Sequence, residues 1–219
     1  MLLYTDNYKK LNHKQKKEIK EGYDSGFPIP YLESCCLPEY NWKQLHQIVM
    51  GYWISKEGRS LYMKPEKTAD QMREIRKGLE HHLSLDQISM FKDGYDWRQM
   101  EQIRLGLESK YSMDQIALFA DKDRNWMQML IIRKALDNDF TPVMIQLMND
   151  KQFHWLQMME IFLALREGLT LAETAEFAVP SCPWWKMHLY RLELEQMKHI
   201  SAQGLFFRKV ADLIIEDAY

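Results

Sequence analysis

Four arginines recur at the same position of a repeated segment, and each is followed four residues later by an acid. The arginines are Arg76, Arg104, Arg133 and Arg191, and the acids are Glu80, Glu108, Asp137 and Glu195. Guanidinium groups bind phosphates and carboxylates through paired hydrogen bonds, so such a row could contact nucleic acid or an acidic face of a partner. Because an acid at i+4 pairs with an arginine on a helix, the spacing favours mutual neutralisation. Partner binding by Arg76, Arg104 and Arg133 is the alternative.

A run of lysines near the start of the sequence is a second candidate binding feature. It comprises Lys9, Lys10, Lys14, Lys16, Lys17 and Lys20, of which Lys9, Lys10, Lys14 and Lys17 are the candidate partner-binding residues. Single-stranded nucleic acid is usually bound with aromatic side chains that stack on the bases. Only Tyr8 and Tyr23 accompany these lysines. The run therefore favours a solvated helix face, with nucleic-acid binding as the alternative.

The histidines and cysteines show no arrangement typical of a catalytic or metal site. None of the seven histidines belongs to an HExxH motif or is paired with a cysteine at zinc-finger spacing. Cys35 and Cys36 are adjacent and could be a reactive or metal-binding pair, but buried structural cysteines are commoner and no histidine is near them in sequence. The sequence also lacks a glycine-rich phosphate loop. We therefore expect no catalytic residues, no metal and no cofactor, and a protein that is not an enzyme.

The candidate arginines belong to a segment that recurs along the chain. WRQMEQIRLGLE at 97–108 is similar to ADQMREIRKGLE at 69–80 and to WMQMLIIRKALD at 126–137. In the same register, copies begin at residues 13, 42, 69, 97, 126, 155 and 184, a period of about 29 residues. Apolar residues such as Met100, Ile103 and Leu107 recur at helical spacing. Each copy therefore predicts an amphipathic helix of about three turns.

Capping residues at two positions of the repeat predict two helices in each copy. The first caps are Asn12, Asn41, Thr68, Asp96 and Asn125, each with a glutamine three residues later, as in a capping box. The second caps are Ser84, Ser112, Thr141 and Thr170. Between them, a left-handed residue is expected to end the first helix at Gly26, His82, Lys110, Asp139 and Gly168.

Helices of this length are marginal in isolation, so each pair must pack on its neighbours. We expect an all-α fold, a right-handed α-solenoid of about seven two-helix repeats that forms a single domain over 1–219. Residues 1–41 and 184–219 are expected to be atypical capping units around repeats at 42–183. The tryptophans Trp97, Trp126, Trp155 and Trp184 are expected to be buried between repeats. The stretch 51–68 breaks the pattern and does not define its second helix.

The WxQMxxIRxGLE pattern, which is clearest over 69–170, resembles tandem repeats of uncharacterised proteins of Firmicutes and their mobile elements. The resemblance implies an all-helical repeat fold and brings no catalytic residues with it. It also implies a function in conjugation, phage biology or anti-defence. One example would be an anti-CRISPR-like inhibitor of a host macromolecule, an inference by association only.

Composition narrows the class of protein further. The net charge of −2 gives no general attraction to nucleic acid or to an anionic membrane. With no apolar run of membrane-span length, no signal peptide and three cysteines, a cytoplasmic location is expected. The predicted function is a protein–protein interaction scaffold, and the alternative is a nucleic-acid-binding repeat protein. The apolar segment 205–219 is expected to seal the last repeat or to form a homodimer.

Overall fold

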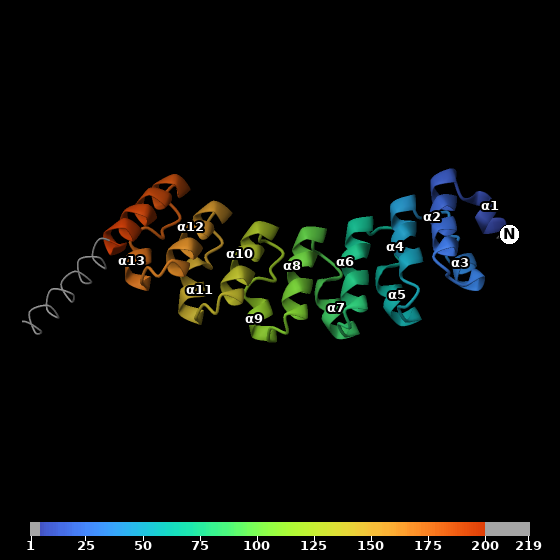
Figure 1. Cartoon of the computed structure of the whole chain (residues 1–219), viewed down its shortest axis with the longest axis horizontal. Helices are drawn as coiled ribbons and strands as arrows, with labels where there is room; N and C mark the ends of the chain where they lie inside the picture. Colours follow the sequence, from blue (N-terminus) through green and yellow to red (C-terminus); the bar gives the residue numbers. More distant parts are fainter. Residues whose placement is uncertain (1–4, 200–219) are drawn as a thin grey trace, which may run out of the picture. The chain divides into compact units, whose positions relative to one another are not determined.

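A computed structural model describes residues 5–199 of the 219-residue chain. All regular secondary structure in this range is helical, which confirms the predicted all-α class (Figure 1). The chain groups into two compact units that divide after Ile116. No helix within 5–199 is long and apolar enough to cross a membrane. The predicted closing helix at 205–219 lies outside the described residues.

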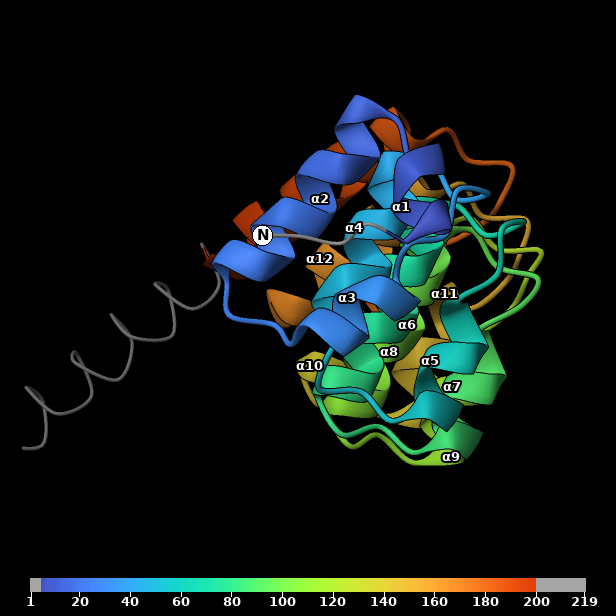
Figure 2. The same ribbon diagram turned by 90° about the vertical axis from the view of Figure 1, so that its right-hand side faces the viewer.

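The first unit alternates longer and shorter helices. They are α1 (Asp6–Lys10), α2 (His13–Asp24), α3 (Ile29–Ser34), α4 (Trp42–Met50), α5 (Lys56–Tyr62), α6 (Ala69–Glu80), α7 (Leu85–Phe91), α8 (Trp97–Glu108) and α9 (Met113–Ala117). The longer helices α2, α4, α6 and α8 pack against one another in chain order. Figure 1 shows α3, α5, α7 and α9 in a second row below the longer helices, and Figure 2 shows α5, α7 and α9 gathered on one side.

The second unit repeats this alternation. It contains α10 (Trp126–Asp137), α11 (Pro142–Met148), α12 (Trp155–Arg166) and α13 (Leu171–Ala175), and residues 184–199 are also helical. Helix α12 packs against α10, α11 and α13. Within each unit the helices thus alternate as two-helix repeats require. A single right-handed solenoid over 1–219 stays a prediction.

The predicted caps begin the helices as expected. Capping boxes are present at all five predicted first-helix starts. A sixth occurs at His154, whose Nδ1 accepts a hydrogen bond from the Leu156 N–H at 3.3 Å. The sequence analysis missed it because histidine is not among the usual capping residues. The second caps Ser84, Ser112, Thr141 and Thr170 also accept hydrogen bonds from backbone N–H groups three residues on.

The predicted left-handed residues end the long helices. His82, Lys110 and Asp139 have φ angles of 64°, 61° and 57°, and Gly26 and Gly168 also have positive φ. At each of these ends, the N–H of the next residue bonds to a carbonyl five residues earlier in the helix. This is the Schellman geometry, which satisfies carbonyl groups that the helix leaves open.

The capping glutamines of the long helices also join consecutive repeats. Gln44 Oε1 accepts the Asn41 N–H at 2.9 Å, while Gln44 Nε2 donates to the Lys67 and Pro65 carbonyls at 2.6 and 2.9 Å. Equivalent bonds reach the residue before the next long helix's cap: Gln15 to Tyr40, Gln71 to Tyr95, Gln128 to Phe153 and Gln157 to Cys182. Glutamate could complete the capping box but has no N–H for the second bond.

The buried core is built from the methionine and isoleucine positions of the repeat. Met72, Met100, Met129, Met158, Ile75, Ile103, Ile132 and Ile161 are all fully buried. The expectation of buried tryptophans was wrong, because Trp97, Trp126 and Trp155 are only partly buried and Trp184 is 43% exposed. A residue in the first position of a long helix lies at the rim of the packed surface. At Trp97 the guanidinium groups of Arg73 and Arg98 lie beside the indole ring there.

The irregular stretch 51–68 does contain a second helix, α5. Its N-cap is Ser55, whose Oγ accepts the Gly58 N–H at 3.0 Å. Tyr62, at the end of α5, is fully buried with its hydroxyl directly against Gly51. Any side chain at residue 51 would overlap that hydroxyl, so glycine allows α5 to approach the end of α4.

Candidate functional site

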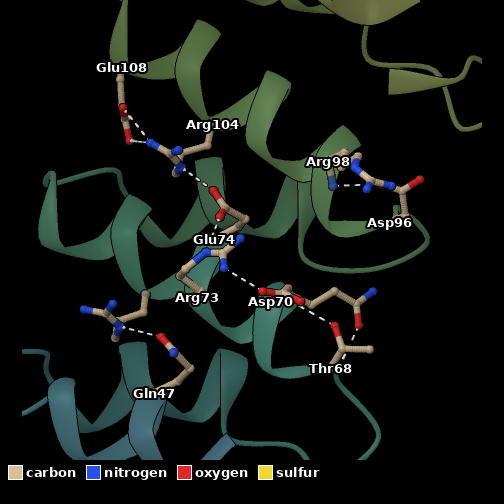
Figure 3. A network of polar contacts seen from close by, with 11 residues as sticks. Gln47, Thr68, Asp70, Arg73, Glu74, Asp96, Arg98, Arg104 and Glu108 are labelled. Atoms are coloured by element: carbon tan, nitrogen blue, oxygen red, sulfur yellow. Dashed lines mark hydrogen bonds and ion pairs between the residues drawn. The ribbon is translucent and has the colours of Figure 1, made fainter. Parts of the chain in front are cut away.

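Arg104 joins two long helices through ion pairs (Figure 3). Its Nε lies 2.9 Å from Glu74 Oε2 on α6, and its Nη1 lies 2.7 and 2.9 Å from the carboxylate oxygens of Glu108. The Arg104 side chain is only 5% exposed. Burial opposes its charged form, but hydrogen bonds and charge from Glu108 and Glu74 outweigh that effect and raise the Arg104 pKa. Arg104 is therefore a charged link inside the protein.

Two further arginines at the same repeat position make equivalent links. Arg76 Nε lies 3.1 Å from Gln47 Oε1 on α4, and Arg191 Nε lies 2.8 Å from Glu160 Oε2 on α12. The predicted pairing with an acid four residues on is present at Arg76, Arg104, Arg133 and Arg191.

The bond to the preceding long helix was not predicted. Its acceptor lies two residues before the arginine position of the repeat, where Gln47, Glu74 and Glu160 are all polar. That polar position on an otherwise apolar face was the signal in the sequence. Both Arg104 and Arg133 are buried, so these two guanidinium groups offer little surface to a partner.

The predicted lysine cluster lies on α1 and α2. Lys9 pairs with Asp6 at 3.0 Å and Lys17 approaches Glu21 at 3.5 Å, and both lysines are well exposed. Lys10 and Lys14 are also exposed. The Lys14 Nζ lies 5.7 Å from the ring centroid of Trp42 on α4. The cluster is thus a solvent-facing helix surface with local ion pairs, and its role in partner binding stays a prediction.

Basic side chains border two of the tryptophans that begin long helices. Lys14 and Lys43 both lie 5.7 Å from the Trp42 ring centroid. The guanidinium carbons of Arg73 and Arg98 lie 5.2 and 4.8 Å from the Trp97 ring centroid. In the sequence, only Tyr8 and Tyr23 lie near the lysines. Trp42, the aromatic residue beside Lys14, was missed because it belongs to the following repeat.

The short helices carry exposed apolar side chains in their first turn. These are Leu85 on α7, Met113 on α9, Val143 on α11 and Leu171 on α13. Val143 is 63% exposed. The residues just before the caps, such as Leu83, Phe140 and Leu169, are instead buried against the long helices. At the caps Ser84, Thr141 and Thr170, the apolar residue before the cap is therefore buried and the apolar residue near the start of the short helix is exposed.

A groove of about 620 Å³ lies between α11 and α13 in the second unit. Its lining is mainly apolar and includes Val143, Leu147, Leu171, Ala175 and Pro180. Two of these, Val143 and Leu171, belong to the exposed first-turn positions. The groove therefore joins the outward apolar residues of consecutive short helices into one concave surface.

A second pocket of about 530 Å³ lies in the first unit between α3, α4 and α5. Tyr31, Cys35, Ile48, Arg59 and Met63 are among its lining residues. The Arg59 guanidinium carbon lies 5.1 Å from the Tyr31 ring centroid. Burial is the main cause that raises the pKa of Cys35 to about 11. The thiol is therefore protonated at neutral pH and unsuited to act as a nucleophile.

The stretch 51–68 also contributes a very exposed aromatic residue. Trp53 is 82% exposed, and its ring forms an edge-on pair with that of Tyr52, with ring centroids 4.6 Å apart. Tyr52 in turn packs against Phe27 and Tyr31. The break in the repeat pattern at 51–68 did not predict this exposed aromatic residue.

Comparison with protein-family models, with curated proteins and with solved structures found no match in any of the three. The assignment of function therefore depends on the residues and geometry of this chain.

Proposed function

We propose that the chain is a non-enzymatic scaffold, a right-handed α-solenoid of about seven two-helix repeats that binds another protein. In each unit, the short helices form its binding surface. The observation that carries this proposal is the recurrence of exposed apolar side chains in the first turns of α7, α9, α11 and α13. Apolar residues that recur outward at one repeat position are typical of the contact face of repeat proteins.

The distribution of contacts between long helices supports this choice of face. Their glutamines bond to the next repeat and their arginines bond to the preceding one. These side chains align repeats and are largely engaged within the protein. The short helices instead keep apolar surface in contact with solvent, so burying it against a partner would be favourable.

The groove between α11 and α13 is the best-formed part of this face. Its apolar walls suit the apolar stripe of a partner's amphipathic helix, which would insert aliphatic or aromatic side chains. A more specific form of the proposal is an inhibitor or adaptor that acts on a host macromolecule. That form rests on the resemblance to mobile-element repeats and not on the groove.

The proposal is tested by capture of partners from a bacterial lysate with the whole chain and matched variants. Val143→Asp places a charge on an exposed groove residue and is expected to remove a stoichiometric partner. Leu192→Asp changes an equally apolar, exposed residue outside the groove and is expected to retain it. Equal capture by both variants, with native circular dichroism, would exclude the groove as the binding face.

A second candidate function is nucleic-acid binding, favoured by the basic side chains around Trp42. Lys14 and Lys43 could contact phosphates while the indole stacks on a base. Binding to a single-stranded oligonucleotide should then weaken steeply as salt increases, and Lys14→Glu with Lys43→Glu should reduce the salt slope. No binding at low salt would eliminate this candidate.

A further inference from the structure

Buried acids on the long helices are neutralised by the arginine of the next long helix. Glu74 on α6 receives Arg104, and Glu160 on α12 receives Arg191. In each case the acid is the sixth residue of its helix and the arginine is the eighth residue of the following one. A buried carboxylate without a positive partner is costly, which explains the pairing.

Helix α2 also has an acid at its sixth position, but α4 has no arginine at its eighth position to pair with it. Glu18 is the sixth residue of α2, and its side chain is only 8% exposed. The eighth residue of α4 is Val49, which is buried and uncharged. The group from α4 that reaches Glu18 is His46, whose Nδ1 lies 2.8 Å from Glu18 Oε2.

A second carboxylate lies beside this pair. Glu21 follows Glu18 by three residues on α2, so both project from the same side of the helix. One ligand atom from each of Glu18, Glu21 and His46 lies within 4.8 Å of the other two. Glu21 and His46 are partly exposed, at 52% and 43% of their side-chain surface, so the group is open to solvent.

We propose that Glu18, Glu21 and His46 bind a divalent first-row metal ion of the Zn²⁺ class. One imidazole nitrogen and two carboxylate oxygens are donors that such ions accept, with water completing the coordination. The ion supplies the positive charge that Arg104 and Arg191 supply elsewhere. The exposed Glu21 side chain must turn away from Lys17 and towards the pair to bring its oxygen to about 2.1 Å from the metal.

The second unit contains a natural control for this site. Glu160 and His188 occupy the positions of Glu18 and His46, and their closest atoms are 3.2 Å apart. There Arg191 already neutralises the acid, and Leu163 stands in place of Glu21. This position is expected not to bind the metal, although it shares the acid and the histidine.

Metal binding would connect α2 directly to α4. Both helices belong to the first unit and pack against each other. An ion that binds only the folded arrangement stabilises it in proportion to its concentration. The first unit should therefore unfold at a higher temperature in the presence of Zn²⁺. This inference does not depend on the proposed partner-binding function.

The test is titration of the full chain with Zn²⁺ after chelator treatment, followed by calorimetry and thermal unfolding. We expect saturable binding of one ion per chain and a rise in Tm. His46→Ala and Glu21→Gln change partly exposed residues and should each weaken binding at least about tenfold. His188→Ala should bind as the unmodified protein does. The proposal is overturned if His46→Ala binds Zn²⁺ with unchanged affinity, if the unmodified chain does not bind it, or if only Ca²⁺ binds.

Discussion

At the level of single residues, the side-chain amide of one glutamine both caps its own helix and bonds to the next repeat. Gln44 accepts the N–H of its own helix cap through Oε1 and donates through Nε2 to two carbonyls before α6. Both functions require the side chain to be held in one orientation, and Gln44 is buried. The long helices therefore use glutamine where a capping box alone would accept glutamate.

Gln44→Glu is expected to lower the free energy of unfolding by about 1–3 kcal/mol, because a carboxylate would face two carbonyl oxygens without an N–H to offer. Urea denaturation measures the change. Gln87→Glu is the matched control, because Gln87 completes the capping box of α7 with Ser84 at a partly exposed position. Glutamate is favourable near a helix N-terminus, so this control should change stability by less than about 0.5 kcal/mol. Similar losses for both variants would contradict the double role of Gln44.

The cysteines should differ sharply in thiol reactivity. Burial is the main cause that raises the pKa of both Cys35 and Cys36 to about 11, whereas Cys182 is partly exposed. At pH 8 we expect one thiol per chain to react quickly with a disulfide reagent and two to react only after denaturation. Absorbance stopped-flow measurements give the count. Two fast thiols in the native protein would show that the α3 region opens.

At the scale of helices, the arginine position determines how strongly each long helix depends on its neighbour. Arg104 neutralises the fully buried Glu74, whereas Arg76 reaches the uncharged Gln47. Loss of the first leaves a buried charge, and loss of the second leaves a neutral amide. Arginines at the same position of the repeat therefore contribute unequally to the free energy of unfolding.

Arg104→Ala is expected to lower the free energy of unfolding by about 3–5 kcal/mol, the usual cost of leaving a buried charge without its partner. Arg73, whose Nε lies 2.9 Å from Glu74, remains in this variant, so we expect the loss of unfolding free energy to be near the lower value. Arg76→Ala should cost only about 1 kcal/mol. Urea denaturation of both variants checks the ranking. If Arg76→Ala were the more damaging, the charge argument would be wrong.

At the level of the whole molecule, polar side chains connect the long helices within each unit. The short helices instead expose apolar side chains to solvent. In the first unit, α4 and α6 each pack between two long helices, whereas α2 has one long neighbour. Stability in repeat proteins comes largely from such nearest-neighbour contacts. Local opening should therefore be easiest at α2.

Amide hydrogen exchange is expected to be slowest in α4 and α6 and at least about tenfold faster in α2. Mass spectrometry after proteolysis resolves these segments. Saturating Zn²⁺ should slow exchange in α2 if the metal joins it to α4. Protection in α2 equal to that in α6 without metal would contradict the nearest-neighbour explanation.

The amino-acid sequence was sufficient to predict the helices, because caps, left-handed turn residues and apolar spacing act over a few neighbouring residues. It placed Asn41, His82 and Met100 in their observed roles. It missed the cap at His154, which uses a ring nitrogen where the common caps use a side-chain oxygen.

The three-dimensional packing was needed to show which side chains meet across repeats. The bonds from Gln44 to Lys67 and from Arg104 to Glu74 join residues more than 20 positions apart, and the spacing within one helix contains no information about them. For the same reason the sequence could not bring Glu18, Glu21 and His46 together, or show that Trp97 lies at the rim. Burial and contact between helices depend on packing, and packing is a property of the neighbouring repeat as much as of the residue itself.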